Sequence, residues 1–171
     1  GLLSQGKVDF DNIEEFRHND FFKLALQLDK IPSSPTLRQR LEYAENKFNQ
    51  IIREESIALL NTVNPVFTPC NYIPLDLDVS PFDNSDSKKE GVSPTYKGYE
   101  GYAPMFAYFG KEGYGVNAEL RKGKTHCQNG TADFLEQTLT YAHSLTDDPI
   151  LVRMDSGNDS KDNIQICLQP E

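Results

Sequence analysis

The chain has 171 residues, which is enough for one domain of ordinary size with an extension. Hydrophobic residues make up 37% of it and aromatic residues 11%, so a core can form. No run of 18 apolar residues is present, which excludes a membrane-spanning helix. The net charge of −9 argues, taken alone, against a nucleic-acid-binding protein.

The first part of the chain, residues 1–69, is predicted to be helical. Asn19 can cap a first helix. Ser34 as cap, with Pro35 at the first helical position, predicts a second, long helix that Asn64-Pro65 ends. Its polar side chains alternate in charge, which fits a solvated face or a surface for phosphates or a partner subunit. We expect this region to serve DNA binding or dimerisation.

From residue 71 the pattern changes from helices to strands. Apolar residues alternate with Asp76 and Asp78, so both carboxylates point to one face of a strand over about 72–80. Carboxylates in an apolar strand are costly to bury without a partner, and a divalent metal ion is one such partner. Both residues are therefore candidate metal ligands.

The remaining chain predicts three more strands and two helices. A segment rich in Gly and Ser, residues 83–101, is expected to be irregular over most of its length. Strands over 102–109 and 114–121 are expected to form an antiparallel hairpin. A helix over 132–145, a strand over 150–155 and a last helix over 160–168 follow. Asp159 is a better cap for the last helix than Asp155, which leaves Asp155 free.

A hairpin followed by a right-handed crossover helix puts the fourth strand beside the first and parallel to it. Asp78 lies late in the first strand and Asp155 ends the fourth, so both carboxylates are expected at the same edge of the sheet, where α/β sheets bind ligands. The predicted fold class is α/β: a mixed sheet in the order strand-strand-strand-helix-strand-helix over 70–171, preceded by the helical region 1–69.

This order of elements resembles the RNase H-like fold, and two motifs resemble those of bacterial DDE-type insertion-sequence transposases. The stretch Leu75 to Ser80 is similar to their first motif, an Asp-x-Ser/Thr after an apolar strand, and its spacing to Ser80 favours Asp78 over Asp76. The stretch Leu151 to Asn158 is similar to the second, Arg-x-Asp-Ser/Ala-Gly. Residues 89–104 and 32–37 are also similar to this group.

The resemblance implies metal-dependent chemistry on DNA. It assigns Asp78 and Asp155 as the catalytic metal ligands, with Asp76 as the less favoured alternative, and Mg²⁺ or Mn²⁺ as the cofactor, because these ions prefer carboxylate oxygens. It predicts a transposase that cleaves DNA and transfers the strand of an insertion sequence. An RNase H-like nuclease without strand transfer and a non-catalytic DNA-binding remnant are the alternatives.

One departure from the family concerns its third carboxylate, a Glu in a Tyr-x-x-Arg-x-x-x-Glu setting on a helix well downstream of the second Asp. This chain reaches Glu171 soon after Asp155 without that motif, and it begins with Gly1. Glu171 is a poor substitute, because no helix follows it. We therefore expect a fragment that lacks the third ligand and is catalytically inactive.

Basic residues between positions 88 and 124 weaken the argument that the net charge makes against nucleic-acid binding. Six of them are candidate phosphate contacts, although solubility explains each single one equally well: Lys88, Lys89, Lys97, Arg121, Lys122 and Lys124. The expected partners are DNA and, in the full-length protein, a second copy of the chain, and no membrane. The three widely spaced cysteines suit a reduced cytoplasmic protein and fit neither a disulfide framework nor a zinc site.

Overall fold

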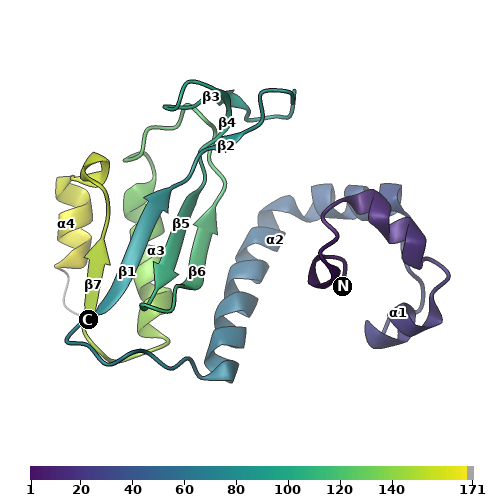
Figure 1. The fold of residues 1–171 in the computed structure, drawn as a ribbon, viewed down its shortest axis with the longest axis horizontal. Helices are drawn as coiled ribbons and strands as arrows, with labels where there is room; N and C mark the ends of the chain where they lie inside the picture. Colours follow the sequence, from purple (N-terminus) through teal and green to yellow (C-terminus); the bar gives the residue numbers. More distant parts are fainter. Residues whose placement is uncertain (169–171) are drawn as a thin grey trace. The chain divides into compact units, whose positions relative to one another are not determined.

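The computed structural model describes residues 1–168, without the side chains of residues 45 and 46. The chain forms two compact units, Gly1–Ile52 and Arg53–Glu171. Helix α2 (Ser34–Val63) begins in the first unit and ends in the second (Figure 1). The predicted boundary at residue 69 lies between the end of α2 and the first strand. No helix within residues 1–168 is long and apolar enough to cross a lipid bilayer.

The first unit is built from short helices around a small apolar cluster. Its elements before α2 are two 3₁₀ helices and one α-helix: η1 (Leu3–Gln5), η2 (Phe10–Phe16) and α1 (Asp20–Ala25). The predicted cap at Asn19 is present, because its side chain accepts a hydrogen bond of 2.9 Å from the Phe22 N–H. Phe22 stacks on Phe16 with ring centroids 4.5 Å apart and is buried with Ile13 and Ile31.

The start of α2 differs by one residue from the prediction. The helix already includes Ser34, and the Ser34 side chain bonds outside the helix rather than capping it. Its hydroxyl donates to Asp11, and its backbone N–H donates to Glu14 Oε1 at 2.7 Å. The helix start is thus tied to η2 by two carboxylates. The hydrogen bond from the Ser34 hydroxyl lowers the pKa of Asp11, and the one from the Ser34 N–H lowers the pKa of Glu14.

Because folding lowers the pKa of these two carboxylates, we expect the first unit to lose stability in acid. A pKa lowered by folding contributes stability that is present above the ordinary carboxyl value and is lost as the pH falls through the lowered pKa. Ser34→Ala removes the hydroxyl donor, so we expect the pKa of Asp11 to rise toward its ordinary value of 3.8. Carbon-13 NMR titration of the side-chain carboxyls checks this. An unchanged Asp11 titration in the variant would contradict the role of Ser34.

The second unit contains a four-stranded sheet in the order β6-β5-β1-β7. Its strands are β1 (Ile73–Val79), β5 (Met105–Phe109), β6 (Tyr114–Glu119) and β7 (Ile150–Arg153). β1 pairs antiparallel with β5 and parallel with β7, as the hairpin and crossover argument predicts. The crossover is helix α3 (Thr131–His143), which lies across one face of this sheet (Figure 1).

A second, small sheet was missed in the segment predicted to be mostly irregular. Three short strands, β2 (Phe82–Asp83), β3 (Ser93–Pro94) and β4 (Glu100–Tyr102), pair in the order β2-β4-β3. This sheet lies at the C-terminal end of β1 (Figure 1). The observed order of elements is therefore longer than the predicted one, because strands of two or three residues are too short to show a period.

The core of the second unit lies between the large sheet and the helices packed on it. It consists of Ile57, Ile73, Leu75, Leu77, Met105, Ala107, Phe109, Val116, Phe134, Leu135 and Ala142. The last elements are η3 (Ser156–Asn158) and α4 (Lys161–Cys167), and α4 packs beside α3. The α4 cap is Ser160, whose hydroxyl accepts from the Asn163 N–H at 3.2 Å, and not Asp159 as predicted.

Candidate active site at the ends of strands β1 and β7

Strand β1 carries its two acids on the face of the sheet that α3 does not cover. Leu75 and Leu77 are buried in the core, so the alternating residues Asp76 and Asp78 project from the opposite face. Asp76 is partly buried and Asp78 is exposed. Their neighbours across β5 are Tyr108 and Phe106 respectively. The expected alternation of the strand is therefore observed.

Asp76 forms an ion pair with Arg153 of β7. The two residues are register partners in the parallel ladder, and the Arg153 Nε and Nη2 atoms each donate to one Asp76 oxygen at 2.5 Å. This hydrogen bonding raises the pKa of the guanidinium of Arg153. Both oxygens of Asp76 are thus engaged by an arginine, which leaves this carboxylate poorly suited to a metal ion.

Asp155 lies two residues after Arg153, just as Asp78 lies two residues after Asp76. It lies just beyond the end of β7, immediately before η3, and its side chain is exposed. Oδ1 of Asp155 accepts a hydrogen bond of 2.6 Å from the Nδ2 atom of Asn158. The parallel register ends at the Asp76–Arg153 pair. An exposed carboxylate follows two residues later in each segment, Asp78 within β1 and Asp155 just beyond β7.

The donor chemistry of these two residues fits a divalent cation. Within residues 1–168, neither the Asp78 carboxylate nor Oδ2 of Asp155 has a hydrogen-bond partner, so carboxylate oxygens are free to ligate. Mg²⁺ and Mn²⁺ favour such oxygens and keep several waters. Across the same described range, no group of three His, Cys, Asp or Glu side chains is arranged to hold a metal ion.

The predicted basic residues divide into an exposed set and one buried residue. Lys88, Lys89, Lys97, Lys122 and Lys124 are exposed. The small sheet brings the segments around residues 89–93 and 122–124 into contact: the Lys124 N–H donates to Ser93 Oγ at 3.1 Å, and the Tyr102 hydroxyl donates to the Glu90 carbonyl at 2.6 Å. Four of the lysines thus lie on two touching segments, while Lys97 lies on a separate turn near the ring of Tyr96.

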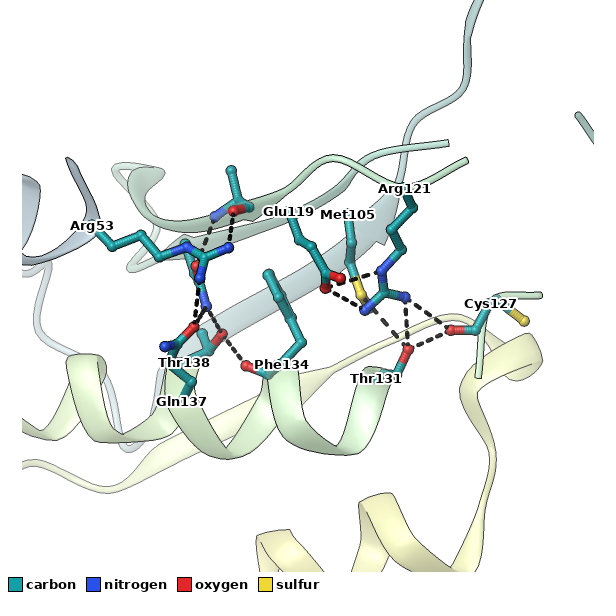
Figure 2. A network of polar contacts seen from close by, with 11 residues as sticks. Arg53, Met105, Glu119, Arg121, Cys127, Thr131, Phe134, Gln137 and Thr138 are labelled. Atoms are coloured by element: carbon teal, nitrogen blue, oxygen red, sulfur yellow. Dashed lines mark hydrogen bonds and ion pairs between the residues drawn. The ribbon is translucent and has the colours of Figure 1, made fainter. Parts of the chain in front are cut away.

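Arg121 differs from the five lysines because it is buried, which corrects its prediction as an exposed phosphate contact. It is 5% exposed, and its guanidinium donates to Glu119 through Nε at 3.1 Å and through Nη2 at 2.9 Å. Nη1 donates to the Thr131 hydroxyl at 3.0 Å and to the Cys127 carbonyl (Figure 2). This network joins the end of β6 to the start of α3. Its donors are occupied inside the protein, so Arg121 is a structural residue and not an exposed phosphate contact.

Two residues of the site escaped the sequence analysis. The first is Arg153, as the partner of Asp76. The two residues carry opposite charges, and the predicted parallel pairing of their strands was the signal that could have identified the ion pair. Asn158 gave a weaker signal: an Asn three residues after an Asp in a Ser-Gly turn is a common turn residue, and its bond to Asp155 is visible only in three dimensions.

Comparison with known proteins places the chain in a family. The family described as transposase DDE domain group 1 matches residues 2–171. No curated protein and no solved structure matches the chain. Because the family match extends over nearly the whole sequence and includes both acidic motifs, the chain belongs to the transposase DDE domain family, group 1.

Proposed function

We propose that this chain is a DNA transposase domain of RNase H-like fold, in which Asp78 and Asp155 bind a divalent cation, Mg²⁺ or Mn²⁺. Membership in the transposase DDE family implies a transposition-related nuclease acting on DNA. The observation that carries the proposal is the parallel pairing of β1 with β7, which supports a shared site for the two exposed carboxylates at the strand ends. Strand transfer of an insertion sequence is the reaction that the two motifs favour.

Each residue of the site has a separate task in this proposal. Asp78 and Asp155 supply the charged oxygens that hold the cation. Arg153 neutralises Asp76 and so limits the repulsion between the carboxylates of β1. When bound, the cation supplies the positive charge that stabilises the reacting oxygens of a phosphodiester. The open face of the sheet leaves room for a DNA phosphate next to Asp78, because this side chain is exposed.

No residue between 1 and 168 is proposed as the third carboxylate of the family's catalytic set. Glu171, the poor substitute considered above, lies outside the described residues. With two carboxylate ligands among residues 1–168, we expect the chain to bind the cation at millimolar concentration.

DNA contacts and self-association complete the proposal. The exposed lysines of the touching segments, Lys88, Lys89, Lys122 and Lys124, suit DNA phosphates near the acidic site, and Lys97 suits a further phosphate. The helices of the first 69 residues would serve DNA binding or dimerisation. A reduced cytoplasmic setting suits its cysteines, which are all free thiols.

The metal site is tested by Mn²⁺ titration followed by NMR. Mn²⁺ broadens nearby resonances, so in the wild-type chain the signals of Asp78 and Asp155 should broaden at millimolar concentration. Asp78→Asn removes one negative charge from the site and should weaken binding by about tenfold or more. The double variant Asp76→Asn/Arg153→Gln is the matched control, because it removes an ion pair of β1 and β7 without changing the net charge beside the site and should alter affinity little.

Two results would reject this site. One is an Mn²⁺ titration that leaves both signals sharp throughout the millimolar range. The other is a loss of affinity in Asp76→Asn/Arg153→Gln as large as that in Asp78→Asn, which would mean that Asp76 and not Asp78 is the ligand of β1. Incubation of the chain with labelled DNA ends then separates strand transfer, which gives a joined product, from simple hydrolysis, which does not.

A further inference from the structure

A buried amide holds an exposed carboxylate at the end of β7. Asn158 is 3% exposed, while Asp155 is exposed to solvent. The Asn158 Nδ2 atom donates to Asp155 Oδ1 at 2.6 Å, and the Asn158 N–H donates to the Asp155 carbonyl at 3.1 Å. One oxygen of the carboxylate is thus fixed by the protein, and the other, Oδ2, remains without a partner in the described part of the chain.

Asn158 is itself held by helix α4. The Nδ2 atom of Asn163, a residue 2% exposed in the first turn of that helix, donates to the Asn158 carbonyl at 2.8 Å. The Cys127 thiol donates to the carbonyl of Gly157 at 3.0 Å from the loop before α3. The turn that follows Asp155 is therefore bonded to two different segments of the fold, so the Asn158 amide has a defined position.

The side-chain amide of Asn158 directs its Nδ2 atom, and not its Oδ1 atom, toward the Asp155 carboxylate. Its Oδ1 atom, like that of Asn163, is buried without a hydrogen-bond partner within residues 1–168. Both residues line an open groove between the end of β7 and α4. Rotating the Asn158 amide would turn its oxygen toward the negatively charged carboxylate, which is repulsive. The amide is thus oriented with its Nδ2 donor toward the Asp155 carboxylate.

We propose that Asn158 is a positioning residue of the metal site: it binds Oδ1 of Asp155 and leaves Oδ2 directed for the cation. This inference rests on the proposed function, because it requires Asp155 to be a ligand. Residues that hold a metal ligand through a hydrogen bond affect metal affinity without touching the metal. Asn163 acts one step further back, by holding the Asn158 main chain.

The test compares Asn158→Ala with a second buried asparagine. Asn117 is 6% exposed on β6, at the opposite edge of the sheet from β7, and its Nδ2 donates to the Thr138 hydroxyl at 3.0 Å. Mn²⁺ affinity is measured by the electron paramagnetic resonance signal of free Mn²⁺, and stability by thermal unfolding followed by circular dichroism. We expect Asn158→Ala to weaken Mn²⁺ binding by about tenfold. Asn117→Ala should lower the melting temperature with Mn²⁺ affinity unchanged.

The outcomes separate this inference from the proposed function. Mn²⁺ binding by Asn158→Ala within twofold of wild type would overturn the positioning role while the metal site stands. Equal losses of affinity in Asn158→Ala and Asn117→Ala would overturn it too, because the effect would then follow stability. Absence of Mn²⁺ binding by the wild type would reject the metal site and this inference with it. If Asn158→Ala does not fold, Asn158→Leu, which keeps a similar side-chain volume but has no hydrogen-bond donor, should show the same tenfold loss, and unchanged Mn²⁺ binding by this variant would overturn the positioning role.

Discussion

Replacing Phe109 by alanine is expected to lower the free energy of unfolding of the Arg53–Glu171 unit by about 3–5 kcal/mol. Phe109 is 0% exposed in the core cluster, and its ring meets that of Phe67 edge-on with centroids 5.0 Å apart. Truncation leaves a cavity that the surrounding sheet and helix cannot fill, so the cost includes lost contacts as well as lost burial. Urea unfolding followed by circular dichroism measures the change.

The neighbouring residue provides the matched control. Tyr108 precedes Phe109 on β5 but points to the open face of the sheet and is 44% exposed. Tyr108→Ala is therefore expected to cost less than about 1 kcal/mol. Equal losses for the two alanine variants would show that the strand does not present alternate faces to core and solvent, and would remove the basis for placing Asp78 on the open face.

Replacing Arg121 by methionine is expected to lower the free energy of unfolding by about 3 kcal/mol. Methionine keeps much of the apolar stem but supplies none of the guanidinium donors. The Thr131 hydroxyl and the Cys127 carbonyl then lose their partner at the start of α3, and Glu119 loses its ion pair (Figure 2). Because Glu119 is partly exposed, solvent screens the charge left behind and limits the loss.

Lys122→Met, at the next position, separates stability from DNA binding. Lys122 is exposed, so its loss should leave the urea midpoint nearly unchanged and reduce the slope of log affinity against log salt for duplex DNA by about one. Fluorescence anisotropy of labelled DNA over a salt series measures this slope. If Arg121→Met left stability intact and instead lowered the salt slope, Arg121 would be a phosphate contact as the sequence alone suggested.

Long elements of this fold could be predicted because their signals are local. The 3.6-residue period of α3, the alternation around Asp76 and Asp78, and the turn between β5 and β6 each depend on residues close in sequence. The small sheet could not be predicted in this way, because its strands have two or three residues. It depends on a close approach of two main-chain segments, because a Cβ at Gly101 would lie 1.9 Å from the Phe82 carbonyl oxygen.

The sequence by itself determined the order of the long strands and helices and the two acidic motifs, since period and spacing are properties of neighbouring residues. Only the tertiary structure decided what each charged side chain meets. Arg153 lies 77 residues from Asp76 and occupies that carboxylate, whereas the Asp78 carboxylate has no hydrogen-bond partner among the described residues. Arg121 is buried while Lys122 is exposed. Partners that meet through folding over such separations leave no local pattern, which is why exposed charges and paired charges of the described residues could be told apart only in three dimensions.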